Sequence, residues 1–146
     1  MSIAQRIQDA MKEAMKTKAQ TRLECLRLAK GALLVKEKET GKEPSDEESI
    51  AVLRAEVKKR QQSMEVYRGL GRDAEVAAVE NEIAVLEEFL PQQLSAEVLE
   101  ARIRAFLGEH PELNHPGKLT GAMKKELGDL ADGKMLNELC KKVLEG

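Results

Sequence analysis

The side chains best suited to metal binding or acid–base chemistry are few in this sequence. His110 and His115 lie in the stretch EHPELNHPG together with Glu109 and Glu112, and each histidine comes directly before a proline. The spacing matches no standard pattern of metal ligands. Because proline biases the preceding residue toward extended backbone, we expect a solvated turn between helices here. We therefore predict no metal site.

Candidates for nucleophilic or phosphate chemistry are equally sparse. Cys25 and Cys140 are far apart, and neither lies in a glycine-rich turn or beside a basic cluster, so we expect buried, reduced thiols. The stretch HPGKLT has the Gly-Lys of a phosphate loop but lacks its upstream glycine and its adjacent Ser or Thr. Acidic pairs such as Glu87 and Glu88 are more typical of a solvated helix face than of acid–base partners. We predict no catalytic residues, no cofactor, and no glutaminase or ligase activity from the isolated protein.

Charge is distributed unevenly along the 146 residues, although the net charge is only −2. Residues 1–43 hold ten Lys and Arg against six acids, whereas residues 74–112 hold nine acids against two arginines. From residue 113 onward, six lysines accompany five acids. This pattern excludes a uniformly basic nucleic-acid footprint but allows two local basic surfaces. The three aromatic residues are too few to build a stacking platform for single-stranded bases.

The first basic surface is expected along one side of a helix that follows residue 45. It comprises four cations at helical spacing: Arg54, Lys58, Arg68 and Arg72. The alternative interpretation is an ordinary solvated face with ion pairs between residues three or four positions apart.

The second basic surface is expected near the end of the chain, where lysines recur across two short helices among several glycines. Its candidate residues are Gly117, Lys118, Gly121, Lys124, Lys125, Asp132, Gly133, Lys134 and Lys141. We expect a helix to start at Pro116 and Gly117, Gly128 to close it in the left-handed conformation, and Asp132 to cap the next helix. Gly121 then remains unexplained inside a helix. It lets another backbone approach, either the neighbouring helix, which we favour, or a nucleic acid.

Apolar periodicity predicts helices along the whole chain and no strands. Capping-box spacing marks three helix starts: Ser2 with Gln5, Thr21 with Glu24, and Ser45 with Glu48. The first helix is expected to bury Ile3, Ile7, Met11 and Met15. A second, from about residue 23 to 39, is apolar on several sides and should be central. Gly41 is its expected C-cap, and Asp73 is expected to cap a fourth helix.

The stretch FLPQQLS at residues 89–95 is the clearest boundary. Pro91 cannot continue a helix, and Ser95 is a good N-cap for the next one. Three short helices follow, at about 96–107, 117–127 and 133–144. We therefore predict an all-α fold with two subdomains, a bundle of about four helices at residues 1–92 and a three-helix unit at residues 93–146.

Three stretches closely resemble the GatB/YqeY family: KKRQQSMEVYRGLGR, ENEIAVLEEFLPQQLS and GKLTGAMKKELGDLADGKMLNELCKKVL. The resemblance runs through essentially the whole chain. It implies a free-standing helical protein whose C-terminal unit is similar to the tail of the B subunit of a glutamine-dependent amidotransferase, which acts on misacylated Glu-tRNA or Asp-tRNA. In that subunit the tail is thought to contact tRNA, and the catalytic domains are absent from this chain. The module is also found appended to some glutaminyl-tRNA synthetases.

By position, the resemblance places RNA contacts on the C-terminal candidates between Gly117 and Lys134. One departure weakens this assignment, because Leu130 stands where the family often has an arginine.

Our leading hypothesis is a non-catalytic tRNA-interaction or adaptor module in aminoacyl-tRNA metabolism. The alternatives are an accessory component of carbon–nitrogen ligation with glutamine as amido-N-donor, and a protein-interaction module that binds no RNA. The expected partners are tRNA and an amidotransferase or aminoacyl-tRNA synthetase, not a membrane, because no apolar run is long enough to cross one. The amphipathic, charged first residues are unlike a secretory signal, so we expect a cytoplasmic protein.

Overall fold

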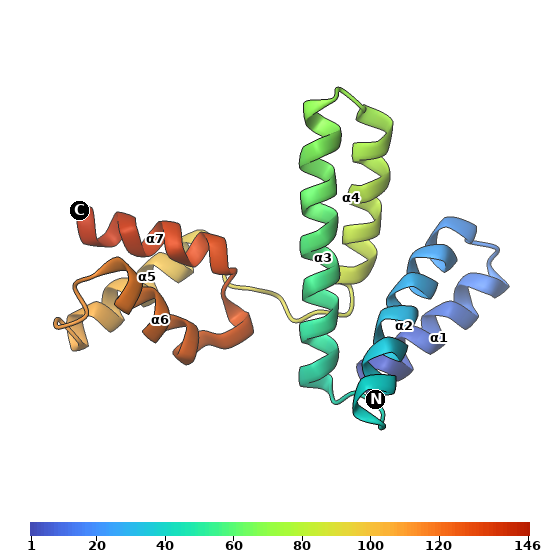
Figure 1. Cartoon of the computed structure of the whole chain (residues 1–146), viewed down its shortest axis with the longest axis horizontal. Coiled ribbons are helices and arrows are strands. Elements are labelled where there is room, and N and C mark those ends of the chain that lie inside the picture. Colours follow the sequence, from blue (N-terminus) through green and yellow to red (C-terminus); the bar gives the residue numbers. More distant parts are fainter. The chain divides into compact units, whose positions relative to one another are not determined.

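A computed structural model describes residues 1–146, and its only regular secondary structure is helical (Figure 1). The elements are α1 (Ile3–Lys16), α2 (Gln20–Thr40), α3 (Asp46–Gly69), α4 (Asp73–Glu87), α5 (Ala96–Glu109), α6 (Pro116–Leu127), the 3-10 turn η1 (Gly128–Leu130) and α7 (Gly133–Glu145). The predicted all-α fold, with an N-terminal helical bundle and a small C-terminal subdomain, is confirmed. The chain divides into two compact units, Met1–Leu90 and Pro91–Gly146. No helix combines the length and the apolar character needed to span a bilayer.

The N-terminal unit is organised around α2, which contacts α1, α3 and α4. Its core is almost wholly aliphatic and includes Ile7, Leu26, Leu53 and Leu86, all fully buried. One predicted core residue is misplaced, since Met15 is 50% exposed and Ala14 is buried instead. Ala14 lies about two turns after Ile7 on the same face, whereas Met15 lies about 100° further round the helix and faces solvent.

Helix starts follow the predicted caps in two of the four N-terminal cases. Ser2 accepts from the Gln5 amide at 3.1 Å, and Ser45 with Glu48 forms a reciprocal capping box. The backbone hydrogen bond from Ser45 lowers the pKa of Glu48. The other two predictions are wrong, because α2 begins at Gln20 after Ala19 and α4 begins at Asp73 itself, with no side-chain cap at either.

Tight backbone turns account for both failures. Lys18 has a positive φ of 59°, and the Ala19 amide donates to the Ala14 carbonyl at 2.9 Å, so the chain re-enters a helix before Thr21 can cap it. Before α4, Gly71 has φ 69° and the Arg72 amide donates to the Tyr67 carbonyl at 2.9 Å. Asp73 therefore lies in the first turn, where its charge favourably meets the helix dipole.

The C-terminal unit packs α5 and α6 against α7 around a second, separate apolar cluster. Its fully buried side chains include Leu99, Ile103, Leu119 and Leu136. Ser95 caps α5 and Asp132 caps α7, both as predicted. Gly128 ends α6 as predicted, but with φ 55° and ψ −129°, which has the expected positive φ without being left-handed helical.

The segment before α5 belongs to this unit through two contacts with η1. The Leu94 amide donates to the Leu130 carbonyl at 2.8 Å, and Gln93 Nε2 donates to the Asp129 carbonyl at 2.9 Å. These bonds give the QQLS part of the boundary motif a physical role, because they anchor the entry to α5 on the turn between α6 and α7.

Candidate functional site

The C-terminal basic surface is solvent-accessible at every candidate position. All nine residues named above are exposed. On α6, the buried residues Leu119, Thr120, Met123 and Leu127 define the inner face. At 100° per residue, Lys118, Gly121 and Lys125 lie at the centre of the opposite face, and Lys124 lies toward one edge. The sequence therefore places Lys118 and Lys125 on either side of Gly121, in the middle of an accessible helix face.

Helix α7 contributes a more mixed surface. Its buried face is formed by Leu136, Cys140 and Val143. Lys134 and Lys141 are seven residues apart and so share the outer face, but the exposed Glu138 lies between them at helical spacing. The face of α6 is thus the more consistently cationic of the two.

The candidate lysines of both helices are electrostatically uncommitted. Lys118, Lys124, Lys125, Lys134 and Lys141 form no ion pair in the structure. The remaining lysine of the unit, Lys142, instead meets Glu100 of α5 at 2.9 Å, and the hydrogen bond from Lys142 lowers the pKa of Glu100. The structure therefore separates one structural lysine from five that remain available to an external anion.

The helix N-termini of this surface are already occupied by side chains. His115 Nδ1 accepts from the Gly117 amide at 3.2 Å, and a Cβ at Gly117 would approach the imidazole ring to 3.4 Å. Asp132 Oδ2 accepts from the Met135 amide at 2.9 Å and places a negative charge at the start of α7. Gly117, Asp132 and Gly133 are thus part of helix caps, which leaves anion binding to the lysine side chains.

The capping role of His115 was missed by sequence reasoning, which assigned this residue to a solvated turn. Histidine is not among the usual N-cap residues, so the only available signal was its position directly before Pro116 at a helix start. His110 contacts the Phe106 ring at 4.5 Å between centroids and Glu112 at 3.5 Å. No group of three potential metal ligands comes together.

Gly121 does not have the packing role that we favoured. A Cβ built at this position meets nothing within 4 Å, so no neighbouring helix requires the glycine. The expectation of a close helix–helix contact is wrong because Gly121 lies on the outer face of α6, opposite the side that packs on the core.

We therefore expect Gly121→Ala to stabilise the C-terminal unit by about 0.5–1 kcal/mol, because alanine has the higher helix propensity and the site is open. Urea unfolding of the full chain would measure the gain. A loss of stability would mean that Gly121 is in contact with something inside the protein.

The first basic surface is much less available, and it does not lie on one helix as predicted, because α3 ends at Gly69 and Arg72 is the residue before α4. Arg68 lies 3.5 Å from Glu65 and 3.6 Å from Glu80 of α4, and Arg72 lies 3.9 Å from Glu75. Arg54 is half-buried, whereas Lys58 is exposed. Pairing of two of the four cations with nearby acids favours the solvated-face interpretation for this helix.

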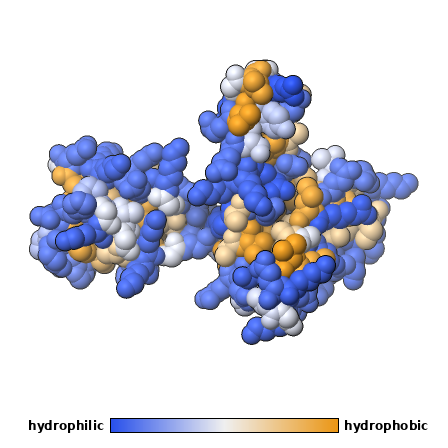
Figure 2. Space-filling model, viewed as in Figure 1, coloured by the Kyte–Doolittle hydropathy of each residue, from blue (hydrophilic) through white to orange (hydrophobic).

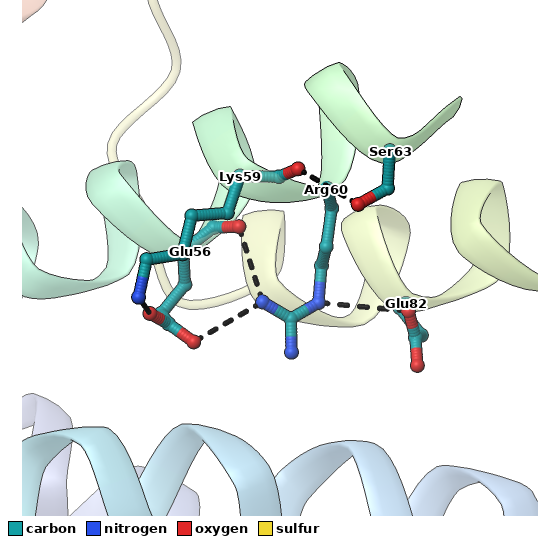
Figure 3. Close-up of polar contacts among 5 residues, drawn as sticks. All are labelled: Glu56, Lys59, Arg60, Ser63 and Glu82. Atoms are coloured by element: carbon teal, nitrogen blue, oxygen red, sulfur yellow. Dashed lines mark hydrogen bonds and ion pairs between the residues drawn. The ribbon is translucent and has the colours of Figure 1, made fainter. Parts of the chain in front are cut away.

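A further arginine on α3, Arg60, holds the α3–α4 pair together. Figure 3 shows its guanidinium between Glu56 of its own helix and Glu82 of α4. Its Nη1 lies 3.2 Å from the Glu56 carboxylate, and its Nε lies 3.6 Å from Glu82 without forming a hydrogen bond. With only 14% of its side chain exposed, Arg60 is structural and cannot serve an external anion.

Both thiols are buried, as predicted, and burial raises the pKa of Cys25 and of Cys140. A thiol held protonated in an apolar core is a poor nucleophile. We therefore expect Ellman's reagent to label neither cysteine in the native protein, with rates at least about tenfold below those in urea. Rapid native labelling of one equivalent would contradict this expectation.

Comparison with known protein families gives one match. The family described as Yqey-like protein matches the chain over residues 4–144. No curated protein matches the chain.

Proposed function

Because the chain belongs to the Yqey-like protein family, we propose that it is a non-catalytic tRNA-interaction module that works beside the enzymes of aminoacyl-tRNA metabolism, such as tRNA-dependent amidotransferases. The single observation that supports this proposal is the set of five exposed, unpaired lysines on α6 and α7. Free ammonium groups on a helix face suit phosphate oxygens, whereas lysines already held by carboxylates would first have to break those pairs.

The lysine face contacts the sugar–phosphate backbone and reads little sequence. Lysine binds phosphate as a point charge, and the unit carries no aromatic side chain on this face that would stack on a base. Gly121 lies between Lys118 and Lys125 and leaves room for a phosphate to approach the helix backbone. The five acids among residues 113–146 offset much of the charge, so binding is weak and depends strongly on salt.

The test is a titration of the full chain with fluorescein-labelled unfractionated tRNA at two salt concentrations, about 50 and 200 mM. We expect binding at low salt that weakens by roughly tenfold or more at the higher concentration, as displacement of a few counterions requires. Failure to bind at the lower concentration, or an affinity independent of salt, would overturn the proposal.

A further inference from the structure

The outer face of α2 is apolar although nothing in the N-terminal unit packs on it. The inner face contributes Leu23, Leu26, Ala29 and Leu33 to the core. On the other side, Leu28 and Val35 are 52% and 58% exposed. In the view of Figure 2, apolar residues emerge among hydrophilic ones over this unit. Apolar residues gathered on one exposed helix face are typical of an interaction surface.

Five exposed residues of α2 form a single seam along this face. They are Glu24, Leu28, Gly31, Val35 and Lys38. Their spacings of four, three, four and three residues reproduce the repeat by which two helices pack along their length. Apolar residues hold the inner positions of the seam and charged residues hold its ends.

Gly31 lies at the centre of the seam and has no role inside the unit. A Cβ at this position meets nothing within 4 Å, and its backbone needs no positive φ. Glycine in the middle of a 21-residue helix is destabilising compared with alanine. What glycine provides here is a surface without a side chain, on which a second helix backbone can lie close.

The charges of the seam specify what that second helix is. Glu24 lies seven residues before Gly31, and Lys38 lies seven residues after it. A second α2 laid antiparallel across Gly31 brings each Glu24 opposite the other copy's Lys38, whereas a parallel copy sets like charges together. Leu28 then faces Val35 of the other copy. Lys38 forms no ion pair within the chain, and Glu24 accepts only a 3.4 Å hydrogen bond from Gln20.

We propose that the outer face of α2 binds the same face of a second copy of this chain, antiparallel and crossing at Gly31. The contact is isologous, so one two-fold axis closes it and no filament results. A single helix pair buries less surface than a standard stable interface, so the dimer is weak and forms at high protein concentration.

Sedimentation equilibrium of the full chain between about 10 µM and 1 mM tests the proposal. We expect a concentration-dependent approach to the dimer mass. Glu24→Lys places lysine opposite lysine at both ends and weakens association by about tenfold or more. Lys38→Glu places glutamate opposite the Glu24 of the other copy at both ends and weakens association equally. The double variant with both changes restores opposite charges, and we expect its association to return to within about threefold of the wild-type value.

The charge-reversal variants report on association and not on folding, because Glu24 and Lys38 are exposed and the fold does not depend on them. A chain that stays monomeric throughout the concentration range overturns the proposal. Association that ignores Glu24→Lys, or that the double variant fails to restore, excludes the antiparallel seam.

Cysteine cross-linking gives an independent measurement in the same full chain. Gly31→Cys places the two new thiols near the two-fold axis, where a disulfide can span the facing backbones, and Cys25 and Cys140 are buried and do not compete. The matched control is Gly69→Cys, because Gly69 is also exposed and also has nothing within 4 Å of a Cβ. We expect mild oxidation to give a covalent dimer with Gly31→Cys only. Equal dimer from both variants would mean random collision and would count against the seam.

Discussion

Replacing Ile103 by alanine is expected to unfold the C-terminal unit of the chain and to leave the N-terminal unit folded. Ile103 is 0% exposed and lies in the apolar cluster of the C-terminal unit. Truncation of a fully buried isoleucine to alanine costs about 2–5 kcal/mol. A unit confined to Pro91–Gly146 has a total stability of roughly 3–5 kcal/mol, so the substitution removes most of it.

Two probes on the full chain would separate the two units. Far-UV circular dichroism should lose only the part of the helical signal that comes from α5, α6 and α7. Amide hydrogen exchange should lose protection at Leu119 and Leu136 but keep it at Leu26 and Leu86, which belong to the other cluster.

Leu53→Ala is the matched control, since Leu53 is 0% exposed in the N-terminal cluster. It should lower the stability of α1 to α4 and leave exchange in α5 to α7 unchanged. If either substitution melts both units in one transition, the two cores are energetically coupled.

Most of the helical framework could be predicted because local signals determine it. Ser45, Ser95 and Asp132 cap helices through contacts only three residues away in sequence. Pro91 interrupts the chain for steric reasons that need no tertiary context. The failures occurred where a neighbouring turn decided the outcome: the positive φ of Lys18 made Thr21 part of a helix already begun.

The candidate site was less predictable because charge availability depends on tertiary pairing. Sequence spacing treated Arg68 and Lys125 alike, yet Arg68 meets Glu80 from another helix and Lys125 forms no pair. For Gly121, helical spacing indicates a place on the outer face of α6, but that no neighbouring element comes within 4 Å of a Cβ there depends on where α5 and α7 lie. The pairing of Lys142 with Glu100 likewise depends on where α5 lies relative to α7.

Which apolar residues of the N-terminal unit stay exposed also depends on tertiary packing. At the end of the α3–α4 pair, Figure 2 shows an apolar patch, and the exposed apolar residues of that end are Val66 and Leu70. The apolar residues on several sides of α2 predicted that it would be central, but packing leaves Leu28 and Leu34 exposed. Helix α2 has three such exposed large apolar residues, whereas α1 and α3 have one each and α4 has none.

The second large effect is expected from simultaneous replacement of Lys118, Lys124 and Lys125 by alanine. Each lysine that contacts a phosphate displaces about 0.7–0.9 of a counterion, so loss of three contacts should reduce the slope of log affinity against log salt by about two units. Affinity for tRNA at about 50 mM salt should fall roughly 10–100-fold. Stability should hardly change, because the three side chains are exposed and unpaired.

The control for that variant removes the same number of positive charges from the first basic surface by changing Lys58 and Arg68 of α3, and Arg72 just before α4, to alanine. Both triple variants shift the net charge by −3, so the comparison keeps the overall charge constant and changes where the cations are lost. We expect the control variant to keep the salt slope within about half a unit of the wild-type value. Equal losses in the two variants would show that tRNA responds to overall charge and would leave α6 with no special role, whereas a loss confined to the α6 variant would locate the phosphate contacts beside Gly121.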